Sequence, residues 1–189
     1  MRLMSSFLLV LLIVTSFHLI SYRLYVMNIE KQLLDNSNER MEIISNKFDN
    51  FFEQTMSMLY RIYDDKKFIP VLRGDISPDQ RKDLWELINT DKTLNKSIFD
   101  IFLVSPGLDM VITSDGVYNI DLYFGKILKN KVYDKEFWFN EGKKKFYYNI
   151  YEAGLFEDIT DPAIVRSYTL TPIALKKSQY PSVILVALL

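Results

Sequence analysis

The chain has 189 residues and a net charge of −1, with 23 basic and 24 acidic side chains mixed along it. A nucleic-acid-binding surface would need a basic patch or stripe, so we expect that no nucleic acid is bound. The sequence contains no cysteine, which excludes a disulfide framework and a thiolate zinc site. Beyond the N-terminal segments described next, about 120 residues remain, which suffice for one small globular domain.

The first apolar run is long enough to cross a membrane. Residues 3–22 contain no Asp, Glu, Lys or Arg, and about 20 helical residues span the hydrocarbon core of a bilayer. We expect residues 1–27 to form a cytoplasmic start and a transmembrane anchor. The alternative is a cleaved signal peptide, whose cut near Ser16 would release a secreted binding protein, but no Ala-x-Ala pattern is present there.

Charges near this run predict its orientation. Arg2 and the amino terminus favour a cytoplasmic N-terminus, although Arg23 and Lys31 follow on the other side. We therefore expect a single-pass protein of the cell membrane with its C-terminal part outside the cell. His18, which is the only histidine, lies within the run, and we interpret it as a tolerated polar residue because one histidine cannot form a zinc site.

Residues 28–66 are predicted to form a long extracytoplasmic helix. No glycine or proline precedes Pro70, and apolar residues recur at helical spacing: Met41, Ile44, Phe48, Phe51, Met58 and Ile62. Two interpretations stay open. The apolar face packs on the chain's own domain, or the membrane-proximal part near Ile29 and Leu33 makes a homodimer contact. A kink or restart is possible at residues 35–38, and the helix should end at Phe68-Ile69-Pro70.

Residues 67–189 are predicted to form one α+β domain. A Ser77-x-x-Gln80 capping box with Pro78 begins a short helix. Apolar runs and turn residues predict the elements that follow. The first are a buried strand 98–104, a strand 110–113 and an Asp115-Gly116 turn, followed by an ambiguous segment 121–131 and a helical turn 134–140. The last are a strand 146–151, an acidic loop to Pro162, and strands 163–173 and 182–189, which are joined by a loop with Lys176 and Lys177. A single antiparallel sheet of about five strands, with helices on one face, satisfies this order.

Several short motifs in this order resemble the extracytoplasmic Cache domains, which are PAS-like sensor modules. They are Ile101-Phe102-Leu103-Val104, the hairpin 111–116 and Glu136-Phe137-Trp138-Phe139, all placed after a membrane helix and a long outer helix. The likeness is to the double-Cache sensors of membrane-bound bacterial AraC-type regulators and sensor histidine kinases, and it covers most of the chain. No second Cache module, second membrane helix or output domain occurs before Leu189, so we expect a truncated product or an output through a partner.

The resemblance implies a function and a fold. It implies a PAS-like sheet whose face and covering loops form a small-molecule pocket, and therefore the sensor portion of a bacterial transmembrane signalling protein that binds an unknown extracellular ligand. We expect no catalysis, because the sequence contains no Gly-x-Ser-x-Gly elbow, phosphate-binding glycine loop or His-Glu-x-x-His motif. The alternative function is a membrane-tethered dimeric scaffold or interaction protein.

The candidate ligand-binding residues are aromatic or polar side chains of the predicted sheet and helical turn: Trp138, Phe139, Tyr148, Tyr151, Arg166 and Tyr168. Trp138 and Phe139 resemble the Trp-aromatic pair of amino-acid-sensing Cache domains, or they only cap the core. Those domains carry an Arg two residues before the Trp to grip a carboxylate, whereas this chain has Glu136. A neutral or cationic ligand is therefore favoured. Which strand face forms the pocket is left open.

The acidic segment before Pro162 carries Glu157, Asp158 and Asp161. We interpret it as a solvated loop, and a contact with calcium or a cationic ligand is the alternative. The Asp-x-Asp-x-Asp-Gly spacing of a calcium-binding loop is absent. We therefore expect neither a metal nor another cofactor.

Overall fold

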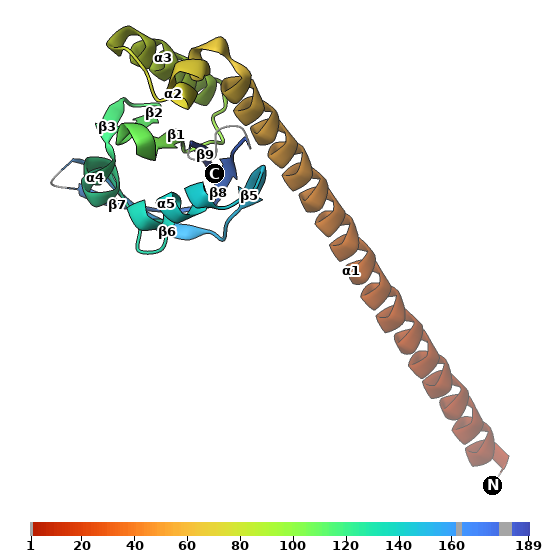
Figure 1. Cartoon of the computed structure of the whole chain (residues 1–189). Helices are drawn as coiled ribbons and strands as arrows, with labels where there is room; N and C mark the ends of the chain where they lie inside the picture. Colours follow the sequence, from red (N-terminus) through yellow and green to blue (C-terminus); the bar gives the residue numbers. More distant parts are fainter. Residues whose placement is uncertain (1, 162–163, 178–182) are drawn as a thin grey trace. The chain divides into compact units, whose positions relative to one another are not determined.

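The structure is a computed structural model that describes residues 2–161, 164–177 and 183–189 (Figure 1). It confirms the α+β class, since a long helix is followed by antiparallel strands and short helices. The chain forms two compact units, Met1–Phe52 and Glu53–Leu189. The second unit holds all of the strands and is the part that can form a folded binding site.

Helix α1 runs without interruption from Arg2 to Asp64 (Figure 1). Among the described residues, it is the one helix long and apolar enough to cross a membrane, with a mean hydropathy of 1.9 over its most apolar window and no buried residue there. Residues 35–38 are helical like their neighbours, so the possible kink is not present. The coarse prediction of an N-terminal apolar helix that continues into a long helix is therefore confirmed.

The apolar face of α1 divides into a covered part and an exposed part. Met58 and Ile62 are buried in the second unit, so the helix packs on its own domain there. Farther toward the N-terminus, Met41, Ile44 and Phe48 are exposed. The homodimer contact near Ile29 and Leu33 stays a prediction.

The end of α1 differs from the prediction. The helix stops at Asp64, and a 3-10 turn η1 (Lys66–Phe68) and helix α2 (Ile69–Arg73) follow. Asp65 starts the 3-10 turn by accepting a hydrogen bond from the Lys67 amide at 2.8 Å. Pro70 lies in the first turn of α2, where its missing amide proton costs nothing, so it begins a helix rather than ending one.

Helix α3 (Pro78–Leu94) begins as predicted. The Gln80 amide donates to the Ser77 hydroxyl at 3.3 Å, and the Ser77 amide donates to the Gln80 side chain at 2.9 Å, which completes the capping box. Leu84 and Ile88 are fully buried, and α3 packs on strands β1 (Asp100–Ser105) and β2 (Met110–Thr113). The next helices are short: η2 (Pro106–Leu108), α4 (Ile120–Leu122), the π-helix η3 (Tyr123–Ile127) and α5 (Lys135–Lys143).

The main sheet has six antiparallel strands in the order β3-β2-β1-β9-β8-β5. Their bounds are β1 Asp100–Ser105, β2 Met110–Thr113, β3 Val117–Asn119, β5 Tyr148–Ile150, β8 Pro172–Leu175 and β9 Ile184–Leu188. Leu103 of the central strand β1 pairs with Ile112 of β2 and with Leu185 of β9. The first and last strands of the domain thus meet at its centre.

A second sheet has three strands in the order β4-β6-β7, which span Leu128–Lys129, Gly154–Asp161 and Ile164–Leu170. The prediction of one sheet of about five strands therefore missed this layer. The acidic segment predicted as an irregular loop instead forms β6, because it pairs along its length with β7. The predicted strand 163–173 is divided at Thr171 into β7 and β8, which belong to different sheets.

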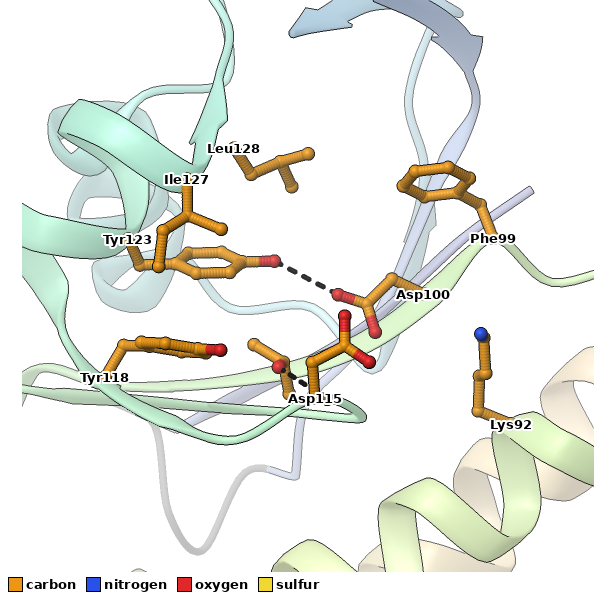
Figure 2. A pocket seen from close by; sticks show the side chains of 9 residues that line it. Lys92, Phe99, Asp100, Asp115, Tyr118, Tyr123, Ile127 and Leu128 are labelled. Carbon is orange, nitrogen blue, oxygen red and sulfur yellow. Dashed lines mark hydrogen bonds between the residues drawn. The ribbon is translucent and has the colours of Figure 1, made fainter. Parts of the chain in front are cut away.

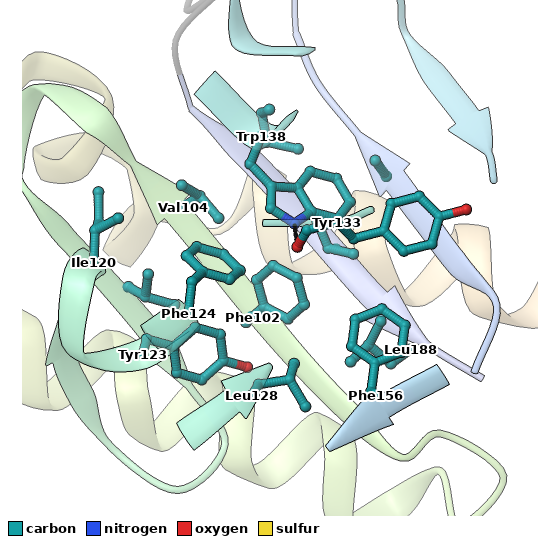
Figure 3. Close-up of a cluster of buried hydrophobic side chains, with 14 of the residues drawn as sticks. Phe102, Val104, Ile120, Tyr123, Phe124, Leu128, Tyr133, Trp138, Phe156 and Leu188 are labelled. Carbon is teal, nitrogen blue, oxygen red and sulfur yellow. Dashed lines mark hydrogen bonds between the residues drawn. The ribbon is translucent and has the colours of Figure 1, made fainter. Parts of the chain in front are cut away.

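The main sheet is covered on both faces (Figure 1). Alternation along β1 turns Ile101 and Leu103 toward the face that α3 covers, and turns Asp100, Phe102 and Val104 toward α4, α5 and the second sheet. Phe102 and Val104 lie there in an aromatic core with Trp138, as Figure 3 shows. Asp100 is the acidic member of this otherwise apolar row.

Candidate functional site

The candidate site is built around Asp100, the first residue of β1. Its side chain is held by hydrogen bonds to Oδ1 from the Ser114 hydroxyl at 2.6 Å, the Ile101 amide at 2.8 Å and the Ser114 amide at 3.3 Å. Ser114 lies in the turn that follows β2, where the Thr113 hydroxyl oxygen accepts the amides of Asp115 and Gly116. The hairpin turn that the sequence predicts therefore also supplies the donors that hold a buried carboxylate.

Two tyrosines face this carboxylate. The Tyr123 hydroxyl, from the start of η3, donates to Asp100 Oδ2 at 3.3 Å. The ring of Tyr118, on β3, stacks on the Tyr123 ring with centroids 6.0 Å apart. In Figure 2 both hydroxyl groups point toward the carboxylates of Asp100 and Asp115. The phenol rings thus form one wall of the site and the carboxylates form another.

These groups line a cavity of about 180 Å³ (Figure 2). Its lining residues come from α3, β1 and the residue before it, the β2–β3 hairpin, η3 and β4: Lys92, Phe99, Asp100, Thr113, Asp115, Tyr118, Tyr123, Ile127 and Leu128. Asp100 is buried, whereas Asp115 is exposed. A concave site with apolar walls and a few convergent polar groups is the usual form of a small-molecule site.

Burial sets the electrostatics of this cavity. Removal from water raises the pKa of Asp100 from 3.8 to about 6, and the nearby Asp115 charge raises it further, while the hydrogen bond from Ser114 opposes the shift. Burial also raises the pKa of Tyr123 well above its ordinary value, and the charge and hydrogen bond of Asp100 add to that. Near pH 7, Asp100 is therefore mainly ionised and both tyrosines are neutral donors.

None of the six predicted ligand-binding residues lines this cavity. Trp138 is completely buried, donates from Nε1 to the Tyr133 carbonyl at 3.1 Å, and contacts Phe102 edge to face with centroids 5.7 Å apart (Figure 3). Phe139 is half-buried against the same core, and Tyr151 donates to Glu141 at 2.8 Å. These placements give Trp138, Phe139 and Tyr151 packing contacts, and a ligand role for them stays a prediction.

Among the other three predicted residues, Tyr168 also packs against this core. Tyr148 is exposed on β5, at an edge of the main sheet, and Arg166 is exposed on β7. Tyr168, also on β7, packs on Phe99 with ring centroids 4.3 Å apart, and Phe99 lines the cavity. Tyr168 therefore contacts a residue of the cavity wall without lining the cavity itself.

Sequence reasoning missed Asp100 and Tyr123, although one signal was present. Asp100 interrupts the apolar run from Ile98 to Val104, and a carboxylate inside a buried strand needs hydrogen-bond partners or a shifted pKa. Its partners come from residues 14 and 23 positions later in the chain. No periodic pattern connects residues at such separations.

No described group of three or more His, Asp or Glu side chains is placed to hold a metal ion. Of the acidic residues before Pro162, Glu157 is half-buried on β6, and the side chains of Asp158 and Asp161 lie outside the described part. The possible calcium contact therefore stays untested there.

A second polar cluster fixes α5 to the end of β8. Lys176 is buried, and its Nζ donates to the carbonyls of Gly142 at 2.6 Å, Glu141 at 3.2 Å and Lys144, which lie at the end of α5, where a helix leaves carbonyls without an intrahelical partner. The Glu141 carbonyl also accepts from the Lys144 amide at 3.1 Å. The ammonium group also lies 5.1 Å from the centroid of the Phe146 ring. The sequence predicts that Lys176 lies in a loop, and only the tertiary structure shows that it caps the end of α5.

Replacing Lys176 with methionine is expected to lower the free energy of unfolding by about 2 kcal/mol, because buried carbonyls lose their donor while the apolar volume is kept. Urea unfolding of the full chain in detergent micelles measures the loss. Lys177→Met is the matched control, since Lys177 forms a partly exposed ion pair with Asp64 and should change stability by less than about 1 kcal/mol. Equal stability of the two variants would show that Lys176 contributes no cap.

Comparisons with family models, curated proteins and solved structures found no match to this chain. The likeness to Cache domains therefore stays a prediction from the sequence.

Proposed function

We propose that this chain is the membrane-anchored sensor portion of a bacterial transmembrane signalling protein, with a Cache-like outer domain that binds a small molecule without transforming it. The observation that carries the proposal is the Asp100 cavity, which combines a buried carboxylate with an aromatic wall. The continuity of α1 with an apolar segment supports the anchor. In this proposal the N-terminus is cytoplasmic and residues 28–189 lie outside the cell.

A chain of contacts supports signal transfer from the cavity to α1. Ser114 holds Asp100, and the Ser114 carbonyl accepts a hydrogen bond from Trp85 Nε1 of α3 at 2.9 Å. At the other end of α3, the buried Asp91 forms an ion pair with Arg61 of α1. A ligand that favours one position of the hairpin would thereby favour one packing of α3 on α1. Such a shift requires different affinities for the two arrangements.

Thermal unfolding of the full chain in nanodiscs, screened against sugars, amines and short peptides, tests the binding step. We expect at least one class to raise the unfolding midpoint, and Asp100→Asn to reduce the rise. Asp83→Asn, an exposed change on α3, is the matched control and should leave the rise intact. A well-folded chain that no compound stabilises would contradict the proposal.

The transfer step has a separate test. The chain lacks cysteine, so spin labels on Ser57→Cys of α1 and Thr93→Cys of α3, both exposed positions, report one distance without background labelling. A stabilising compound should change this distance in the otherwise unchanged chain. In Trp85→Phe, which keeps a ring but loses the Nε1 donor, the compound should still bind and the distance change should shrink. An equal change in both proteins would exclude this route.

A membrane-tethered dimeric scaffold is the second candidate function, and the exposed apolar residues of α1 favour it. Leu33, Leu34 and Ile44 are each more than 60% exposed, and an isolated helix in water gains little from such residues. Cross-linking of the full chain in nanodiscs would show a dimer that is lost in the double variant Ile29→Asp plus Leu33→Asp. A ligand-indifferent dimer with this behaviour would favour the scaffold over the sensor.

A further inference from the structure

The Asp100 cavity carries an uneven distribution of charge. Asp100 and Asp115 place two carboxylates on its lining, and Lys92 of α3 places one ammonium group there. Among the described residues, Lys92 forms no ion pair with either carboxylate. The remaining polar groups are the hydroxyls of Thr113, Tyr118 and Tyr123, which are neutral near pH 7. With both carboxylates ionised, the lining is therefore net negative.

The buried carboxylate has unused acceptor capacity on the cavity side. Asp100 Oδ1 accepts three hydrogen bonds, whereas Oδ2 accepts one, from Tyr123 at 3.3 Å, which is longer than a typical O–H···O contact. An ionised carboxylate out of water gains most from a cationic donor. Burial raises its pKa to about 6, and none of the described lysines and arginines forms an ion pair with it.

The walls add a second preference. The hydroxyl groups of Tyr118 and Tyr123 point toward the carboxylates, and their oxygens can accept hydrogen bonds from an ammonium group placed there (Figure 2). An anion would meet Asp100 and Asp115 at short range, and a neutral ligand would leave the carboxylate charge unbalanced. The cavity volume of about 180 Å³ suits a small molecule.

We propose that the cavity binds the ammonium group of a small organic amine, with Asp100 as the buried anionic partner, Asp115 as the partner at the rim and the hydroxyl groups of Tyr118 and Tyr123 at the wall. This inference rests on the proposed sensor function and names the ligand class of the same site. Lys92 lies on the same lining and weakens the attraction, so its removal strengthens binding of a monocation.

The experiment uses the full chain in nanodiscs of phosphatidylcholine, which has no net charge and no primary amine. Butylammonium is the probe, and 1-butanol and butyrate are its neutral and anionic counterparts of similar size, all at matched ionic strength. Ligand-observed NMR titrations measure binding, and thermal unfolding measures stabilisation. We expect butylammonium alone to bind, Asp100→Asn to weaken it at least about tenfold, and Lys92→Gln to strengthen it a few-fold.

Two further variants keep the test decisive if Asp100→Asn folds poorly. Tyr118→Phe keeps the half-buried ring and both carboxylates and removes only the hydroxyl that points toward them, so it should weaken butylammonium binding a few-fold. Asp83→Asn, the control, should leave butylammonium binding unchanged. Below pH 6, protonation of Asp100 should weaken butylammonium binding about tenfold per pH unit. The charged and titratable groups that share the cavity with Asp100 are Asp115, Lys92, Tyr118 and Tyr123.

The outcomes separate this inference from the function on which it rests. If 1-butanol or sugars stabilise the chain through Asp100 and butylammonium does not, the sensor function stands and the amine specificity is wrong. If no compound in the wider screen binds, both fail. Butylammonium binding that is equal in Asp100→Asn and in the unchanged chain would place the amine elsewhere and overturn the inference.

Discussion

Replacing Trp138 with alanine is expected to lower the free energy of unfolding by about 3–5 kcal/mol, the usual cost of removing a fully buried large aromatic side chain. The indole contacts Phe102 and Phe137 edge to face and donates a hydrogen bond to the Tyr133 carbonyl. Its loss would leave a cavity between α5 and the main sheet together with an unpaired carbonyl. Neighbouring rings are already packed on one another and can fill that space only in part.

Urea unfolding of the full chain in detergent micelles measures this loss. The sequence has two tryptophans, so the fluorescence of Trp85 reports unfolding when Trp138 is absent. Tyr147→Ala is the matched control, because its ring is 67% exposed and its removal should cost less than about 0.5 kcal/mol. A loss below about 1 kcal/mol for Trp138→Ala would contradict a core role and return the residue to consideration as a pocket wall.

The stability of the domain should fall by up to about 3 kcal/mol between pH 4 and pH 6 because of Asp100 alone. The folded-state pKa is about 6 and the ordinary value is 3.8. Within this window the folded chain keeps the proton that the unfolded chain releases, so a rise in pH favours the unfolded state. Above pH 6 both states are ionised and the loss stays constant. One pH unit of pKa difference corresponds to about 1.4 kcal/mol.

The difference in free energy of unfolding between the unchanged chain and Asp100→Asn isolates this effect from other carboxylates. Asparagine keeps the size of the side chain and an oxygen that accepts from Ser114, and it does not titrate. The free energy of unfolding of Asp100→Asn should therefore increase relative to that of the unchanged chain as the pH rises from 4 to 6. The free energy of unfolding of Asp83→Asn should change with pH in the same way as that of the unchanged chain. A pH-independent difference for Asp100→Asn would mean that Asp100 titrates normally.

The predictions for Trp138 and Asp100 concern different parts of one domain. Trp138 lies in the aromatic core that joins the main sheet to α5, and its residue type contributes packing energy. Asp100 lies on the same face of the sheet, and its raised pKa predicts that its ionised form weakens the fold. A buried carboxylate retained at a cost to stability is typical of functional sites. This contrast supports the proposal that the cavity, rather than the Trp138 region, is the place of ligand binding.

The predicted sensor residues illustrate where sequence reasoning stops. Trp138 and Phe139 were identifiable as an aromatic pair, but whether such a pair lines a pocket or fills a core depends on what the opposite side of the space contains. Phe102, Tyr133 and Phe156 fill it here, and they come from β1, the α5 approach and β6. Residue type alone cannot distinguish the two environments, because aromatic side chains are enriched in both.

The sequence by itself determined the local elements. The long N-terminal apolar run, the capping box at Ser77 and the short apolar run Ile101–Val104 are local signals, and each element they predict is present. Only the tertiary structure decided that the acidic segment forms β6 and that Lys176 caps α5. It also decided that Asp100 meets Tyr123 across a cavity. The physical reason is that these arrangements depend on strand register and on contacts between distant segments, whose free energy is gained only when the whole domain packs.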